Sequence, residues 1–289
     1  MKRIITLWKV GMLIGLMALG GCNGSGEEPL PPAATNDWSV SLSRSTTNGE
    51  HVTVALRYGD TSSYGTLVPA AEGEKATWLN DLKPEWPTDN TTAVEAIAFC
   101  PAVTTLPQTV SAFDSIAYRM DYIPCTSATK PSQFILTHLM AQLVVHIQLY
   151  DDEAHHYRPT DAVINLFTKA EVDYTHKQLT DSTARMEWQL GTFDRENESF
   201  GSDENWVNTP QVVVPQTFPA GEPCLSFRAG EITYTFVPEN SITLTAGKRT
   251  NIYLGVAYEN AHAIQAGFSI TDWAEGETIS DNIFNSDNN

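Results

Sequence analysis

The sequence predicts an all-β protein made of β-sandwiches. Short segments in which apolar and polar residues alternate recur along the chain, and clusters of Gly, Pro, Asn and Asp separate them. The sequence shows no internal repeat and no heptad pattern. Alternation with a period of two is the pattern of a strand that buries one face, and many short strands between turn residues are typical of a sandwich.

Five segments of the first half are expected to be strands. In the first of them, Trp38, Val40 and Leu42 lie on the same side. Residues 78–92 carry prolines among polar residues, which predicts a loop between two of these strands. The expected strands are residues 38–43, 51–58, 65–68, 94–99 and 115–122.

The segment of residues 134–149 (FILTHLMAQLVVHIQL) fits two kinds of element. His138, Gln142 and His146 are four residues apart and would align on one face of a helix. However, the apolar residues alternate up to the end of the segment, and Val144, Val145 and Ile147 are β-branched, which favours a strand. We therefore expect one long strand here.

The second half adds further short strands and ends in a hairpin. Residues 242–277 are expected to form a strand, a tight turn, a second strand, a polar loop and a last strand that closes on Trp273. Residues 192–208 form a long acidic loop, of the kind that carries binding or stays unordered. The other expected strands are residues 162–167, 184–190, 211–214, 224–227 and 231–237.

The N-terminus has the pattern of a lipoprotein signal peptide. Its first nine residues hold three basic side chains, residues 10–20 are apolar, and residues 19–22 (LGGC) match a lipobox. The apolar stretch is too short to span a bilayer. We expect residues 1–21 to be removed and Cys22 to carry acyl chains, which would anchor the protein in a membrane.

Residues 22–37 are expected to be a disordered, lipidated stalk, because they are rich in Gly, Ser, Pro and Glu. Glu27 and Glu28 resemble the acidic export signal that sends Bacteroidetes lipoproteins to the outer face of the outer membrane. About 250 residues then remain, which is enough for two β domains or one large one.

The chain is strongly acidic. It holds 17 basic and 35 acidic residues, for a formal charge of −18. The leader contributes three basic residues and no acidic ones, so the chain from Cys22 onward carries −21. Such a surface repels phosphate backbones, which excludes nucleic acid as a partner.

Three cysteines follow Cys22, an odd number for an oxidising compartment. Cys100 and Cys125 each adjoin a proline and are candidates for one disulfide. Cys224 would then be a buried free thiol. The alternative is that all three thiols are unpaired, since free buried cysteine is common.

We find no pattern that predicts catalysis, a metal or a cofactor. The nucleophile elbow, the zinc-protease helix and the phosphate- and dinucleotide-binding loops are all missing from the sequence. His138 and His146 would lie about 27 Å apart on one strand, too far to share an ion. We therefore expect a protein that is not an enzyme, with no metal and no cofactor.

Trp78, Trp86 and Trp206 are candidate glycan contacts, because they lie in expected loops and a tryptophan offers a flat apolar face to a sugar ring. The alternative is that these side chains fill sandwich cores or fasten loops. Glycan contact would suit a surface lipoprotein that captures nutrients.

Two features at different places in the chain carry a family resemblance. Residues 242–277 hold an AGK turn at residues 246–248 and end their last strand in the pair Asp272-Trp273. Residues 134–138 (FILTH) form an F-x-L-x-H pattern followed by alternating aliphatic residues. This order resembles the fimbrillin-like proteins, which are lipoprotein subunits of Bacteroidetes surface fimbriae.

The resemblance implies two transthyretin-like β-sandwich domains, residues 38–131 and 132–289, behind the signal peptide and stalk. It also implies a structural or accessory, tip-like subunit on the cell surface that takes part in adhesion. Its partners would be the outer membrane through the lipid anchor, other fimbrial subunits through donor-strand insertion, and a host or bacterial surface ligand.

The resemblance further implies a way of assembly. Polymerising fimbrillins are understood to lose an N-terminal strand by cleavage after an arginine, and a neighbour's C-terminal strand fills the groove. Arg44 follows the expected strand of residues 38–43 and precedes small polar residues suited to proteolysis. Near the C-terminus, Ile279 and Ile283 alternate, but Asp281 shares their face and would enter the groove as an unpaired charge. We therefore expect an acceptor of a strand that is a poor donor.

Overall fold

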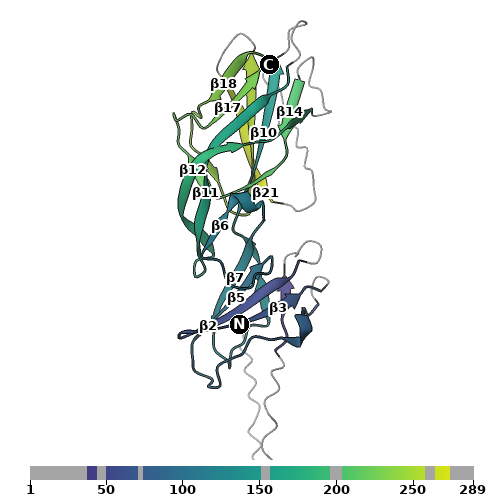
Figure 1. Ribbon diagram of the computed structural model, residues 1–289, viewed down its shortest axis with the longest axis vertical. Coiled ribbons are helices and arrows are strands. Elements are labelled where there is room, and N and C mark those ends of the chain that lie inside the picture. Colours follow the sequence, from purple (N-terminus) through teal and green to yellow (C-terminus); the bar gives the residue numbers. More distant parts are fainter. Residues whose placement is uncertain are drawn as a thin grey trace, which may run out of the picture. The chain divides into compact units, whose positions relative to one another are not determined.

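The computed structural model describes residues 38–43, 50–70, 74–150, 157–195, 204–257 and 264–273 (Figure 1). Within these ranges the regular elements are strands and two single 3-10 turns, so the expected all-β class is confirmed. Cys22, Arg44 and the C-terminal residues 274–289 lie outside the described residues.

The first sheet is antiparallel and has six strands, in the order β4-β3-β2-β5-β7-β9. Both of its faces are buried: Val52 and Val54 face one core, while Ala55 faces another. This explains why five successive residues of β2 are buried although their sequence alternates only weakly. The strands are β2 (Val52–Tyr58), β3 (Thr61–Val68), β4 (Thr77–Trp78), β5 (Val94–Cys100), β7 (Arg119–Cys125) and β9 (Thr137–His138).

Two further sheets, of six and five strands, follow and pack on each other. One has the order β13-β14-β10-β20-β21, with β15 also paired to β10, and the other has the order β12-β11-β17-β18, with β6 paired to β11. Their bounds are β6 (Thr109–Ser111), β10 (Ala141–Tyr150), β11 (Thr160–Asp173), β12 (Gln178–Gln189), β13 (Phe193–Arg195), β14 (Glu204–Asn208), β15 (Gln211–Val213), β17 (Leu225–Ala229), β18 (Ile232–Phe236), β20 (Lys248–Ala257) and β21 (Ile264–Asp272).

The core between these two sheets combines side chains of both. Leu143, Val145 and Ile147 of β10 meet Ile164 and Leu166 of β11 in one buried cluster. A short pair, β16 (Gln216–Phe218) with β19 (Ile242–Leu244), adds to the same cluster. Two facing sheets that bury alternate residues against each other form a β-sandwich. Figure 1 shows strands of both sheets, β10 and β11 among them, in the same part of the molecule.

The prediction of one long strand over residues 134–149 is wrong. The segment forms β8 (Gln133–Ile135), β9 and β10, and the chain leaves the first sheet for the second at Leu139 and Met140. Both of these side chains are fully buried. The alternation expected from Ala141 to Leu149 is confirmed, because those odd-numbered residues all face the core of the sandwich.

The closing hairpin is confirmed as β20 and β21, which pair with each other. The expected acidic loop of residues 192–208 is wrong at its two ends, because β13 and β14 pair there. Pairing with β14 also places β13 at the edge of a sheet. Acidic residues are compatible with an edge strand because one side of it stays in water.

A further cluster, the junction core, links the first sheet to the later strands. Ile97 and Phe99 of β5 lie with Met140, Tyr174 and Val214 in it. Tyr174 stands at the tip of the β11–β12 hairpin and is buried against the first sheet. The division of the chain at residue 131 into two domains stays a prediction, since residues 38–289 form one compact unit.

Candidate functional site

The first described segment, residues 38–43, is held by backbone on both of its sides. Its strand β1 (Ser41–Ser43) pairs in parallel with β8, and the N–H of Ser41 donates to the carbonyl of Ser132 at 2.9 Å. On the other side, the N–H of Ala76 donates to the carbonyl of Val40 at 2.9 Å. The segment is therefore an inserted strand, and we call the groove that holds it the strand seat.

The side chains of the inserted strand fill the strand seat in alternation. Trp38 is 5% exposed and Val40 is fully buried, while Leu42 packs against the same cluster. The indole N–H of Trp38 donates to the carbonyl of Pro131 at 2.7 Å. These are the residues whose alternation the sequence shows, and the expectation of a strand with one buried face is confirmed.

Aromatic rings form the floor of the strand seat. The ring of Trp38 lies 5.2 Å from that of Trp78, 4.9 Å from that of Trp86 and 6.4 Å from that of Phe134, measured between centroids. The indole N–H of Trp78 donates to the carbonyl of Trp38 at 3.1 Å. Tilted and edge-to-face arrangements at these distances are favourable for aromatic rings.

Of the three candidate glycan contacts, Trp78 and Trp86 both pack on Trp38, and Trp206 belongs to a different cluster. Trp78 is buried beneath the inserted strand, so its prediction as a glycan contact is wrong: its faces are covered by protein. Trp86 is half-buried in the same cluster, with the Nζ of Lys130 over its ring at 5.1 Å. Trp206 lies on β14 against the core of the sandwich, under the guanidinium of Arg158. The alternative stated for these residues, that they fill cores and fasten loops, describes them better.

The predicted disulfide is wrong. On the paired strands β5 and β7, Cys100 is opposite Arg119 and Cys125 is opposite Val94. The two cysteines thus stand at opposite ends, about 20 Å apart along the strands, whereas bonded cysteines have Cα atoms within about 7 Å. All three described cysteines are free thiols.

The thiols are also held in their neutral form. Burial raises the pKa of Cys100 and of Cys224 to about 12, in spite of the guanidinium beside each. Burial raises the pKa of Cys125 as well. Since the thiolate is the nucleophile and the metal ligand, this arrangement suits packing and not covalent chemistry.

The two histidines that were weighed as metal ligands stack on aromatic rings. His138 lies over Trp273 at 4.4 Å, and His146 lies over Tyr253 at the same distance. Among the described residues, no three side chains of His, Cys, Asp or Glu converge on one point. The described part of the chain contains no helix long and apolar enough to cross a membrane.

The sequence could have revealed more of the strand seat than it did. The prolines around Trp78 and Trp86 predict a loop, and alternation at Trp38 predicts a strand, so neither pattern links the three residues. An aromatic residue on a first strand and two more in a proline-rich loop are the available signal. The backbone pairing of Lys75 and Ala76 with the inserted strand cannot be predicted from the sequence, because two residues are too few to show a period.

Comparison with known proteins agrees with this architecture. The family model described as Fimbrillin-like matches residues 34–273. The chain resembles the crystal structure of a candidate cell adhesion protein from Bacteroides uniformis, with 15% identity and a TM-score of 0.55 over 82% of this chain and 97% of that one. No curated protein matches the sequence.

Two fimbrial proteins are also among the similar structures. A fimbrial protein from Bacteroides vulgatus has 12% identity and a TM-score of 0.47, and the match covers 82% of this chain and 99% of that one. A fimbrial assembly protein from Parabacteroides distasonis has 11% identity and a TM-score of 0.42, with coverage of 77% and 92%. The family model spans most of the sequence, and on that match the chain belongs to the fimbrillin-like family.

Proposed function

We propose that the protein is a fimbrial subunit of the accessory, tip-like kind that is exported as a lipoprotein, accepts a strand from a neighbouring subunit and takes part in adhesion. The observation that carries the proposal is the strand seat, in which Trp38, Val40 and Leu42 pack into one hydrophobic cluster. Membership of the fimbrillin-like family supports the fimbrial role. The description of the Bacteroides uniformis protein as a candidate cell adhesion protein supports the adhesive role.

The strand seat has the properties of an acceptor groove. Removal of residues 38–43 would leave the N–H of Ala76 and the carbonyl of Ser132 without backbone partners. It would also uncover Trp78 and Phe134. An extended peptide with large apolar residues at alternate positions restores both kinds of contact, with the backbone giving affinity and the side chains giving specificity.

The two ends of the chain set the direction of assembly. Arg44 comes directly after the inserted strand, so cleavage there would release residues 22–44 together with the lipid on Cys22. At the other end, Asp281 lies between Ile279 and Ile283 and would place a charge inside an acceptor groove. The chain is therefore an acceptor rather than a donor, which suits a subunit that occurs once per fibre.

The test separates acceptance from donation. The full exported chain carrying Cys22→Ala is cut with an arginine-specific protease and mixed with a fluorescent peptide that copies the C-terminal strand of a polymerising fimbrillin. The cut protein should bind the peptide, and the uncut protein should not. An Arg44→Ala chain treated with the same protease is the matched control and should behave as the uncut protein.

Two results would contradict the proposal. The cut protein alone should stay monomeric in light scattering, because its own tail is a poor donor, and long homopolymers would show that it is a shaft subunit. Equal binding of the peptide before and after cleavage would show that the strand seat is not the acceptor.

A further inference from the structure

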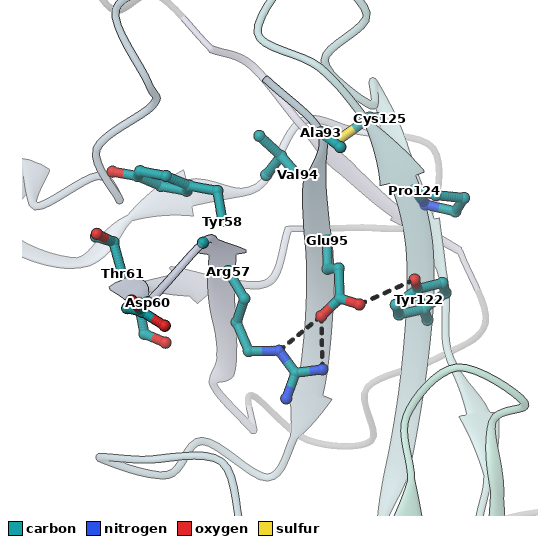
Figure 2. Close-up of a pocket in the computed structure, with 12 residues that line it drawn as sticks. Arg57, Tyr58, Asp60, Thr61, Ala93, Val94, Glu95, Tyr122, Pro124 and Cys125 are labelled. Atoms are coloured by element: carbon teal, nitrogen blue, oxygen red, sulfur yellow. Dashed lines mark hydrogen bonds and ion pairs between the residues drawn. The ribbon is translucent and has the colours of Figure 1, made fainter. Parts of the chain in front are cut away.

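A pocket of about 590 Å³ opens at one end of the first sheet, and the proposed strand acceptance does not use it. The β2–β3 hairpin supplies residues 57–62 to its wall, β5 supplies Glu95, and β7 supplies Tyr122 (Figure 2). Sites for small molecules are concave and of about 300–1,000 Å³, so the pocket has the size of a ligand site.

The polar side chains of the pocket are fixed before a ligand arrives. The Nε of Arg57 donates to the Oε2 of Glu95 at 2.9 Å, and its Nη2 lies 2.7 Å from the same oxygen. The hydroxyl of Tyr122 donates to the Oε1 of Glu95 at 3.3 Å, so both carboxylate oxygens are engaged (Figure 2). The guanidinium of Arg57 also lies over the ring of Tyr174 at 5.2 Å. Fixed polar groups lose less entropy on binding.

These groups keep hydrogen-bonding capacity for a ligand. A guanidinium has five N–H donors and a carboxylate has about four acceptor positions, so the Arg57–Glu95 pair uses only part of what it has. Burial, followed by the charge of Glu95, raises the pKa of Tyr122, which keeps its hydroxyl protonated. Asp60, in the exposed turn of the hairpin, adds further acceptors, and Thr61, the exposed first residue of β3, adds a hydroxyl.

The charges of the pocket favour a neutral ligand. Arg57, the one cation among the described residues of its wall, is already paired with Glu95, and Asp60 adds a negative charge. The chain as a whole carries −18, which further disfavours an anion. The rings of Tyr58 and Tyr122 supply flat apolar surface beside the donors and acceptors.

A ring with many hydroxyls, each able to donate and accept, matches such a wall. We infer that this pocket binds a neutral saccharide residue. The inference deepens the proposed function, because it names a ligand class for the adhesive role and rests on that role. It assigns the contact to Glu95, Asp60 and the tyrosines in place of the tryptophans that the sequence suggested.

The experiment uses the uncut, full exported chain with Cys22→Ala. Saturation-transfer NMR is recorded with the methyl glycosides of glucose, galactose, mannose and N-acetylglucosamine, and with a sialoside. At least one neutral glycoside should bind, and Glu95→Ala and Asp60→Ala should each weaken it about tenfold, as expected when a hydrogen bond to a charged group is lost. Asp81→Ala, an exposed acidic residue outside the pocket, is the control and should leave binding unchanged.

Thermal melts of every variant show whether the fold is retained. If none of the four neutral glycosides binds, or if Glu95→Ala and Asp60→Ala bind as the parent does, the inference is overturned. Preference for the sialoside, lost in Arg57→Ala, would overturn the neutral class of ligand. Strand acceptance is measured separately on the cut protein, so binding of a sugar without binding of the peptide would reject the proposed assembly and keep the saccharide site.

Discussion

The Nζ of Lys177 lies 2.7 Å from the Oδ1 of Asp121, and this ion pair joins the tip of the β11–β12 hairpin to the first sheet. The Asp121 side chain is 4% exposed and that of Lys177 is 40% exposed. The same carboxylate accepts from the N–H groups of Ile135 and Tyr122 at 2.8 Å. A buried carboxylate held in this way fixes the hairpin, β7 and β8 with respect to one another.

Removal of either partner should therefore lower the free energy of unfolding. Asp121→Ala should cost about 3 kcal/mol, because it removes the ion pair and two backbone acceptors. Lys177→Met should cost about 1 to 2 kcal/mol, since its charge is partly in water and the backbone bonds of Asp121 remain. Lys169→Met, at an exposed position of β11, is the control. Urea denaturation of both single variants and the double variant measures the coupling, and additive losses would show that the pair is not coupled.

Gly65 is required where the proline-rich loop crosses β3. A Cβ at this position would lie 2.5 Å from the Cδ of Pro84 and 2.9 Å from the ring of Trp78. Gly65→Ala should therefore destabilise the protein by about 1 to 3 kcal/mol through overpacking. Gly191→Ala is the control: its φ of +79° is strained for alanine, but nothing lies within 4 Å of the new methyl group. If Gly65→Ala loses no more stability than Gly191→Ala, crowding against Pro84 and Trp78 is not what requires a glycine at position 65.

Asp89 makes the stability of the loop before β5 depend on pH. Its carboxylate accepts from the hydroxyl of Thr92 at 2.6 Å and from the N–H groups of Thr91 and Thr92. These bonds, led by the Thr92 hydroxyl, lower the pKa of Asp89 far below its ordinary value of 3.8.

A pKa that is lower in the folded state than in the unfolded state adds stability above the unfolded value and loses it as the pH falls. Asp89→Ala should thus be less stable than the parent at pH 7, and the difference should shrink below about pH 4. Thermal melts from pH 7 to pH 2.5 follow this change. A difference that does not vary over that range would show that packing, and not the ionised carboxylate, carries the effect.

The sequence predicts the strands well and their partners poorly. The alternation of Trp38, Val40 and Leu42 marks a strand with one buried face, because that pattern is local. The break at Leu139 and Met140 leaves no such mark, since an apolar residue fits either a continuing strand or a crossing between sheets. The ion pair of Asp121 and Lys177 joins residues 56 positions apart in a chain with many charges, so no local pattern selects it.

The lipid anchor can be tested by labelling the whole protein in cells. Because residues 19–22 match a lipobox, Cys22→Ala should abolish labelling by a clickable fatty acid and move the protein from the detergent phase to the aqueous phase. Cys224→Ala, which removes a buried thiol, is the control and should be labelled as the parent is. Normal labelling of Cys22→Ala would show that the lipid is attached elsewhere or that the leader is not a lipoprotein signal.

The inserted strand should depend most on its first residue. Trp38→Ala removes a ring that contacts Trp78, Trp86 and Phe134, together with the hydrogen bond to Pro131. Replacement of a buried aromatic residue by alanine typically costs about 3 to 5 kcal/mol, because a cavity adds to the lost burial. The variant should unfold at a lower urea concentration.

If the strand is held mainly by Trp38, the variant should also be cut at Arg44 faster than the parent, since residues 38–43, which precede the bond, leave the strand seat more often. Leu42→Ala is the matched control, because Leu42 is only partly buried in the same strand and should shift both measurements less. Timed digestion with an arginine-specific protease, with the product identified by mass, gives the rate at that one bond. Equal rates for Trp38→Ala and the parent would show that the tryptophan stabilises the sheet without holding the strand in its seat.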